Sequence, residues 1–159
     1  ANGCQTVLDI GFGTGTLTQK LYEHGCTVYG QDFSQRMIEL AKVKMPKAEL
    51  YQGDFTKGLV ETLKQNRYDA IIATYSLHHL TDAEKVVFIE NLRPLLNDGG
   101  KIYIGDVMFG NRVQLEACKA DAGDEWDGDE IYFVVDELQA RFPQMRFEPL
   151  SYCSGVLTL

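Results

Sequence analysis

Residues 7–15 read Val-Leu-Asp-Ile-Gly-Phe-Gly-Thr-Gly and carry the chain's most informative chemistry. An apolar strand runs directly into a loop with glycine at positions 11, 13 and 15, and an amphipathic helix is expected to begin near Thr16. A loop without side chains lets the backbone press against a ligand. The order strand, glycine loop, helix is typical of a cofactor site at the carboxyl end of the first strand in an open α/β sheet.

The spacing of the glycines indicates which class of cofactor the loop binds. A dinucleotide loop has the pattern Gly-x-Gly-x-x-Gly, and its third glycine is replaced here by Thr16. The pattern from Asp9 onward, Asp-x-Gly-x-Gly-x-Gly, resembles motif I of the class I methyltransferases, which use S-adenosylmethionine. A tight turn without a ligand is the alternative for the loop alone. A nicotinamide-dependent oxidoreductase is a further alternative, and Thr16 argues against it.

Strands and helices alternate along the chain, which predicts a mostly parallel α/β sheet. Strands are expected at residues 4–10, 26–31, 48–52, 68–75, 101–108, 145–152 and 154–159. Helices are expected at residues 16–24, 34–45, 56–65, 81–96, 111–122 and 134–142. Capping boxes are expected at Thr16 with Gln19 and at Thr81 with Glu84, and Ser34 is expected to cap its helix.

The last two strands follow each other with almost no residues between them. A parallel crossover needs about a dozen residues or more, so this pair must be an antiparallel hairpin. The expected fold class is therefore α/β, a Rossmann-like doubly wound sheet with an antiparallel terminal hairpin. The resemblance to the class I methyltransferases implies seven strands in the order 3-2-1-4-5-7-6.

The ends of the second and third strands carry acidic residues where a bound adenosine would need them. Asp32 ends the second strand, where a carboxylate can accept both ribose hydroxyl groups, and capping of the next helix is the alternative. The resemblance implies that Asp54 accepts the adenine amino group. Phe33 and Phe55 would form an apolar adenine slot that Met37 closes, with core packing as the alternative for each.

Residues 68–80 resemble motif IV of the same family. The resemblance places backbone of Thr74 and Tyr75 along the methionine end of the cofactor, and Asp9 near its ammonium group through water. The full set of expected cofactor-binding residues is Asp9, Gly11, Phe12, Gly13, Gly15, Asp32, Phe33, Met37, Asp54, Phe55, Thr74 and Tyr75. The expected cofactor is S-adenosylmethionine, with S-adenosylhomocysteine as product.

Methyl transfer from a sulfonium mainly requires the acceptor to be held about 3 Å from the methyl carbon and in line with it. A general base is needed only if the acceptor must lose a proton. His79 and Tyr75 are the candidate catalytic residues, and His78 and Asp106 lie nearby at strand ends. Packing or helix capping is the alternative for both histidines. No third ligand follows the histidine pair at useful spacing, so no metal site is expected.

Several motifs are absent, and their absence narrows the range of possible methyl acceptors. The fourth strand is not followed by Asp/Asn-Pro-Pro-Tyr, and no Pro-Cys occurs, so methylation of nucleic-acid bases is disfavoured. The net charge of −8 also disfavours nucleic acid and anionic membranes as partners. A small-molecule acceptor is expected. A domain that binds S-adenosylmethionine or S-adenosylhomocysteine without catalysis is the alternative, because no base can be identified. The oligomeric state is left open.

Composition and length are those of one domain over residues 1–159. With 45% hydrophobic and 24% charged residues, the chain is neither disordered nor membrane-spanning. Four scattered cysteines without a Cys-x-x-Cys pair favour a cytoplasmic location. The first strand begins close to Ala1, so we expect the domain to lack the N-terminal lid segment of the family. Residues 108–133 are expected to supply part of a lid, through Met108, Phe109, Trp126, Tyr132 and Phe133.

Overall fold

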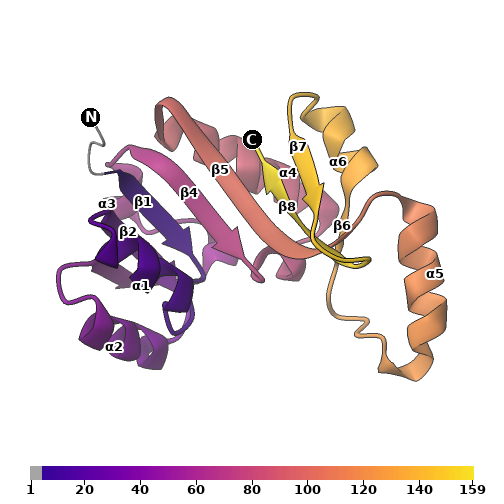
Figure 1. Ribbon diagram of the computed structural model, residues 1–159, viewed down its shortest axis with the longest axis horizontal. Helices are drawn as coiled ribbons and strands as arrows, with labels where there is room; N and C mark the ends of the chain where they lie inside the picture. Colours follow the sequence, from indigo (N-terminus) through magenta and orange to yellow (C-terminus); the bar gives the residue numbers. More distant parts are fainter. Residues whose placement is uncertain (1–4) are drawn as a thin grey trace.

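The central sheet has the strand order β3-β2-β1-β4-β5-β8-β7 in a computed structural model that describes residues 5–159 (Figure 1). The strands are β1 (Thr6–Ile10), β2 (Thr27–Asp32), β3 (Glu49–Gln52), β4 (Tyr68–Thr74), β5 (Leu96–Phe109), β6 (Phe133–Val134), β7 (Arg146–Pro149) and β8 (Ser154–Thr158). Strands β1 to β5 run parallel, and β8 is antiparallel to both β5 and β7. The predicted order 3-2-1-4-5-7-6 is confirmed, because β7 and β8 are the sixth and seventh strands expected from the sequence.

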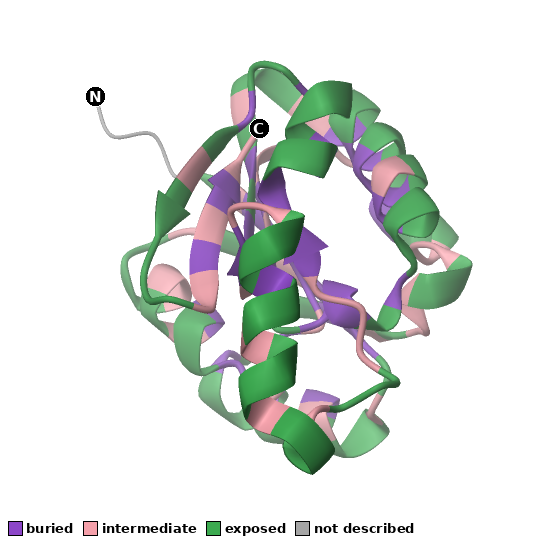
Figure 2. Cartoon of the chain, turned by 90° about the vertical axis from the view of Figure 1, so that its right-hand side faces the viewer, coloured by how far each residue is buried: buried purple, intermediate pink, exposed green. Residues whose placement is uncertain are grey.

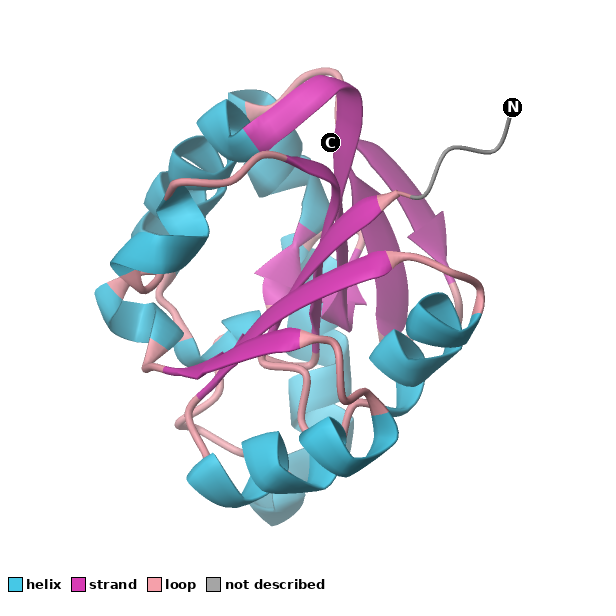
Figure 3. Ribbon diagram, turned by 90° about the vertical axis from the view of Figure 1, so that its left-hand side faces the viewer, coloured by secondary structure: helices cyan, strands magenta, loops and turns pink. Residues whose placement is uncertain are grey.

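Helices cover both faces of the sheet (Figure 3). They are α1 (Thr16–Glu23), α2 (Gln35–Lys44), α3 (Glu61–Lys64), α4 (Asp82–Leu92), α5 (Arg112–Ala122) and α6 (Val135–Arg141). Short 3₁₀ turns are η1 (Phe55–Lys57), η2 (Leu77–His79), η3 (Arg93–Leu95) and η4 (Gly123–Glu125). One core cluster joins α3, α4 and α6 to the sheet, and a second joins α2 to β2 and β3.

The central strands are apolar because both of their faces are covered. Leu8, Ile71, Ile102 and Ile104 have no exposed surface, and burying a side chain of this size contributes about 1.5–3 kcal/mol. Figure 2 shows the strands buried beneath helices whose outer surfaces are exposed. The rigid sheet therefore fixes the carboxyl ends of β1 to β5, where the candidate site lies.

The side-chain caps predicted from the sequence are confirmed at two of three positions. Ser34 accepts a hydrogen bond from the Met37 amide, and Thr81 with Glu84 forms both hydrogen bonds of a capping box. The capping box at Thr16 is wrong: the cap of α1 is Gly15, with φ of 73° and no side-chain hydrogen bond. The glycine loop itself therefore ends in a left-handed turn that begins α1.

The other differences from the expected elements are local. The helix expected at 56–65 is instead η1 and the one-turn α3, because Gly58, with φ of 99°, interrupts it. In β5, Leu96 pairs with Tyr68 and Lys101 with Ala70, so residues 97–100 loop out and the strand begins at Leu96, before its expected start at Lys101. The two-residue β6 was not expected. Residues 1–4, which include Cys4 at the expected beginning of the first strand, lie outside the described part of the chain.

The chain leaves the end of β5 through α5 and η4 and returns to it at β6. We call the segment between η4 and β6, residues 126–132, the strap. In Figure 1, α5 lies at the opposite end of the molecule from α1 and α2. Within residues 5–159, no helix is long and apolar enough to cross a membrane.

Candidate functional site

A pocket of about 410 Å³ lies at the carboxyl ends of the central strands. Its size is that of a small-molecule or cofactor site. It is lined by six of the expected cofactor residues, together with the candidate catalytic residue His79; the six are Gly11, Asp32, Phe33, Asp54, Phe55 and Tyr75. Thr56 and Ser76 also line it, and the sequence analysis did not single them out. Residues from four separate loops thus meet in one place.

The glycine loop forms one wall of this pocket. Gly11 has φ of 70°, and a Cβ atom there would lie 2.9 Å from the Cβ of Ser76, so glycine is required. Gly13 has φ of 57°, and no atom lies within 4 Å of the position of its missing Cβ. The Gly13 amide donates a hydrogen bond of 2.8 Å to Oδ2 of Asp32. The loop is therefore fastened to the carboxylate at the end of β2.

Asp32 is 9% exposed and is oriented by two backbone amides. Oδ2 accepts from Gly13, and Oδ1 accepts from the Ser34 amide at 2.9 Å. Each carboxylate oxygen can accept more than one hydrogen bond, so both can still receive hydroxyl donors. Ser34, not Asp32, caps α2. The arrangement suits a pair of neighbouring hydroxyl groups such as those of a ribose.

Asp54 caps the short turn η1. Its Oδ1 accepts the Thr56 hydroxyl at 2.6 Å and the Thr56 amide at 3.0 Å. The hydroxyl hydrogen bond is the main reason that the pKa of Asp54 is lowered. Its Oδ2 lies 3.9 Å from Nζ of Lys57. Asp54 is therefore a fixed acceptor at the rim of the pocket, as an adenine amino group would need.

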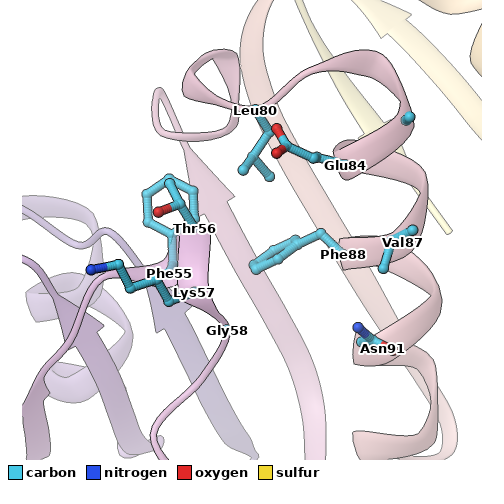
Figure 4. Close-up of a pocket in the computed structure, with 10 residues that line it drawn as sticks. Phe55, Thr56, Lys57, Gly58, Leu80, Glu84, Val87, Phe88 and Asn91 are labelled. Atoms are coloured by element: carbon cyan, nitrogen blue, oxygen red, sulfur yellow. The ribbon is translucent and has the colours of Figure 1, made fainter.

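Two aromatic side chains flank Asp54 and Asp32 but differ in exposure. Phe33 is 73% exposed, whereas Phe55 is partly buried and packs edge-on against Phe88 with 5.9 Å between ring centroids. Phe55 also lines a neighbouring pocket of about 400 Å³ between η1 and α4. Figure 4 shows Phe88 extending from α4 toward η1 in that pocket. Phe55 thus forms a partition between the two pockets, and Phe33 is free to cover an adenine ring.

Asp9 has an unusual environment at the end of β1. It is 1% exposed, and Oδ2 accepts the Thr18 hydroxyl at 2.6 Å. Its Oδ1 is one of two buried side-chain polar atoms in the described chain without a hydrogen-bond partner. Burial raises the pKa of Asp9 to about 6, with a smaller contribution in the same direction from the charge of Asp32, while Thr18 opposes the shift. A cationic or hydrogen-bond donor ligand would satisfy this oxygen.

Tyr75 follows β4 in a strained backbone conformation. Its φ of 51° is the only positive value at a non-glycine residue within residues 5–159. The Tyr75 amide donates to the Gly105 carbonyl at 2.8 Å, and the side chain is 62% exposed. Strain of this kind is maintained only where surrounding structure enforces it, and it often occurs at functional sites. The preceding Thr74 ends the strand beside Gly105.

The remaining expected cofactor residues lie around the pocket but do not line it. The Phe12 side chain packs in the core beneath α2, so only its backbone remains for a ligand. Gly15 begins α1, and Met37 lies half-buried in the first turn of α2. Asp9, Gly13 and Thr74 are likewise outside the lining. Their roles at the cofactor stay predictions.

The two adjacent histidines have different surroundings. His79 is exposed and lines the pocket, whereas His78 is 8% exposed. His78 Nδ1 lies 2.9 Å from Oδ1 of Asp106, and Nε2 lies 3.5 Å from Oε1 of Glu130 in the strap. Among the described residues, no group of three or more His, Cys, Asp or Glu side chains is placed to hold a metal ion. Nothing in the sequence context of Glu130 signals its contact with His78.

None of residues 108–133, which were expected to supply part of a lid, lines the pocket. Met108, Phe109 and Phe133 are buried in the core, so the expectation is wrong for these three residues. Trp126 and Tyr132 are half-buried in the strap, with ring centroids 5.1 Å apart in an edge-on arrangement. Burial, together with a hydrogen bond to Glu130, raises the pKa of Tyr132 to about 12.

Comparison with known proteins shows the family to which the chain belongs. The methyltransferase domain family model matches residues 7–100. An uncharacterized methyltransferase of Anoxybacillus flavithermus is 46% identical over 116 residues, which are 73% of this chain and 53% of that protein. An uncharacterized methyltransferase of Bacillus cereus is 46% identical over 149 residues, covering 89% of this chain and 68% of that protein. The chain therefore spans only about half to two thirds of the length of these relatives.

Solved structures share the fold at lower identity. The DhpI–SAM–HEP complex is 20% identical with a TM-score of 0.74, over 96% of this chain and 77% of that one. Magnesium protoporphyrin IX methyltransferase from Synechocystis with bound SAH is 19% identical with a TM-score of 0.72, over 98% of this chain and 73% of that one. The class I methyltransferase fold expected from the sequence is thus confirmed, and the chain belongs to the methyltransferase domain family.

Proposed function

We propose that this domain binds S-adenosylmethionine in the pocket at the ends of β1 to β4 and transfers its methyl group to a small-molecule acceptor. The observation that carries the proposal is the Asp32 carboxylate, which lines the pocket and is fastened to the glycine loop through Gly13. This geometry suits an adenosine whose ribose hydroxyls reach a carboxylate while the rest of the ligand lies along a loop free of side chains. Neighbours of the same fold hold SAM and SAH.

The other residues at the pocket would contact different parts of such a ligand. Asp54 and the exposed Phe33 stand at the adenine end of the pocket. Gly11 and Tyr75 stand toward the methionine end, and the unpartnered oxygen of the buried Asp9 would face the ammonium group, directly or through water. S-adenosylmethionine supplies an activated methyl group when bound. The residues of this chain then hold the acceptor in line and exclude water.

His79 and Tyr75 are the proposed residues on the acceptor side. Both line the pocket, and both follow β4 directly. His79 would accept a proton if the acceptor must lose one, and Tyr75 would orient the acceptor through its hydroxyl group. Small acceptors are favoured over nucleic acid because the charged residues that line the pocket, Asp32 and Asp54, are both acidic.

The test is calorimetric titration with S-adenosylmethionine, S-adenosylhomocysteine and NAD. The expected result is micromolar affinity for the two adenosyl ligands, none for NAD, and loss of binding in Asp32→Ala. Asp98→Ala is the matched control, because Asp98 is exposed in the loop of β5 away from the pocket. Binding that survives in Asp32→Ala, or tighter binding of NAD, would contradict the proposal.

A non-catalytic domain that binds the same ligands is the second candidate. It is favoured by the exposure of the Tyr75 and His79 side chains, because exposed groups do not exclude water from a reacting acceptor. Incubation with S-adenosylmethionine and panels of amine, thiol, hydroxyl and carboxylate acceptors separates the two functions. Acceptor-dependent formation of S-adenosylhomocysteine identifies an enzyme, and binding without turnover on any panel identifies the non-catalytic domain.

A further inference from the structure

The turn η2 joins a buried histidine to a pocket-lining one. The ring centroids of His78 and His79 are 4.4 Å apart, with 54° between the ring planes. His79 therefore rests against the ring of His78, and any rotation of that ring changes the space that His79 can occupy. The position of His79 at the pocket depends on what holds His78.

His78 is held on both sides. Its Nδ1 lies 2.9 Å from Oδ1 of Asp106, and a carboxylate oxygen accepts hydrogen bonds, so Nδ1 must carry the hydrogen. The neutral ring is then the Nδ1–H tautomer, with the lone pair on Nε2. Nε2 lies 3.5 Å from Oε1 of Glu130, and the His78 carbonyl accepts the Ile131 amide at 2.8 Å. One residue thus connects η2 to β5 and to the strap.

One carboxylate oxygen of Asp106 lacks a hydrogen-bond partner. It is 1% exposed, and Oδ1 also accepts the Val107 amide at 2.8 Å. Its Oδ2 is the second buried side-chain oxygen without a partner in the described chain. An unpaired buried carboxylate oxygen costs stability, and an apolar side chain in its place would avoid that cost. A charged group in such a place favours a functional role over a purely structural one.

Contacts of Lys85 also hold the strap next to His78. The buried Lys85 of α4 donates a hydrogen bond to the Ile131 carbonyl, while the Ile131 amide donates to His78. Lys85 also lies 3.5 Å from Asp82 and 4.7 Å from the centroid of the Phe133 ring. Both backbone groups of Ile131 are therefore bound, and the strap is held next to η2.

We propose that Asp106 and His78 are positioning residues for methyl transfer: Asp106 sets the tautomer and orientation of the His78 ring, and that ring holds His79 at the pocket. The hydrogen bond from the Ile131 amide to the His78 carbonyl fastens the strap to the same residue. The inference rests on the function proposed above, because it gives His79 its place beside the acceptor. His78 does not line the pocket, so it acts through His79.

The tautomer provides a direct test, because the chain has only three histidines. Long-range ¹H–¹⁵N spectra of the labelled protein are expected to show His78 as the Nδ1–H tautomer. In Asp106→Asn the side-chain amide can donate to Nδ1, which favours the Nε2–H tautomer, and the ring signals of His79 are expected to move with it. His24 is the internal control, since its Nδ1 lies 2.7 Å from the Lys20 carbonyl and it makes no contact with Asp106.

The Nε2–H tautomer for His78 in the parent protein would overturn the proposal without any variant, so the test stands even if Asp106→Asn does not fold. Unchanged His79 signals in a folded Asp106→Asn would overturn it as well. A purely structural role for Asp106 would lower the melting temperature of the variant without moving the His79 ring signals.

Cofactor binding and turnover separate this proposal from the function on which it rests. S-adenosylhomocysteine, used as the calorimetric probe, is expected to bind Asp106→Asn within about twofold of the parent, because Asp106 does not line the pocket. With an acceptor from the panels, methyl transfer is expected to fall about a hundredfold. A parent that binds no adenosyl ligand would refute the proposed function, while the tautomer would still decide the role of Asp106. Equal losses of affinity and turnover would contradict positioning.

Discussion

Replacing Asp9 by asparagine is expected to stabilise the protein without ligand at neutral pH. The pKa of Asp9 is raised by burial from 3.8 in the unfolded chain to about 6 in the folded protein, so folding is opposed once the carboxyl ionises. The protonated Asp9 carboxyl is favoured in the folded protein. Its contribution to stability is therefore fully present below about pH 3.8 and is lost as the pH rises through about 6. The shift of about 2 units corresponds to about 3 kcal/mol at about 1.36 kcal/mol per unit.

Asparagine keeps the shape of the side chain but does not ionise. The Thr18 hydroxyl can still donate to its carbonyl oxygen, so the hydrogen bond of 2.6 Å is retained. Urea unfolding near pH 7.5 is therefore expected to show Asp9→Asn more stable than the parent by up to about 3 kcal/mol. The difference is expected to shrink between about pH 6 and pH 4 and to vanish below that range.

Asp69→Asn is the control with the opposite sign. A hydrogen bond from the Thr6 amide is the main reason that the pKa of Asp69 is lowered, so its contribution is present at neutral pH and is lost as the pH falls through its folded pKa. This variant is expected to be less stable than the parent near pH 7.5 and to approach it in acid. An Asp9→Asn variant that is less stable than the parent at neutral pH, or a difference that does not change with pH, would refute the reasoning.

The Asp9→Asn substitution is also expected to weaken cofactor binding. The unpartnered Oδ1 of Asp9 is the group proposed to face the ammonium of S-adenosylmethionine. A hydrogen bond to a charged group is worth about 1.5–3 kcal/mol, so the dissociation constant is expected to rise about tenfold to a hundredfold. A gain in stability together with a loss of affinity would show that this carboxylate is retained for its ligand.

Other substitutions test the loop and the helix caps. Gly11→Ala is expected to abolish adenosyl binding, which calorimetry measures, and to lower the free energy of unfolding by about 1–2 kcal/mol or more, which urea unfolding measures. The reason is that Gly11 has φ of 70° and that an added Cβ would lie 2.9 Å from the Cβ of Ser76. Gly13→Ala meets no atom within 4 Å, so its loss of stability is expected to be smaller. Thr81→Ala removes the capping box with Glu84 and is expected to cost about 1 kcal/mol in thermal unfolding, with the affinity for S-adenosylhomocysteine unchanged. A Thr81→Ala variant with altered affinity would show that α4 influences the cofactor pocket.

Much of the fold followed from local rules. The short connection between the last two strands required a hairpin, and β8 is indeed antiparallel to β7. Ser34 and Thr81 marked the beginnings of α2 and α4, because a hydroxyl before an amphipathic segment is a local signal. The order of the strands came only from the resemblance to a known family, since local patterns do not specify which strands are neighbours.

The errors arose where local signals conflicted or were too short. Thr16 has the sequence context of a capping residue, but the left-handed Gly15 begins α1 and leaves Thr16 in its first turn. Gly58 breaks the segment that was expected to be one helix, because it needs a positive φ. The two residues of β6 are too few to show a period, and only their pairing with β5 defines the strand.

The candidate site was predictable where its residues follow strands. Asp32, Asp54 and Tyr75 each stand at or just after the end of a parallel strand, and such ends meet at one edge of a sheet. Of the two histidines, His79 was the candidate expected from the sequence, and it is the one that lines the pocket. Burial of His78 depends on Asp106 and on Glu130 from a distant segment, and such tertiary contacts have no periodic signature.

Amide chemical-shift mapping with S-adenosylhomocysteine tests the central claim most directly. The account predicts the largest shifts at Gly11, Gly13, Asp32 and Phe55, which line the pocket or bond to its lining residues, and negligible shifts at the exposed Tyr152, which does not line it. Shifts confined to other surfaces, or no shifts in a folded protein at millimolar ligand, would contradict the assignment of this pocket to the cofactor.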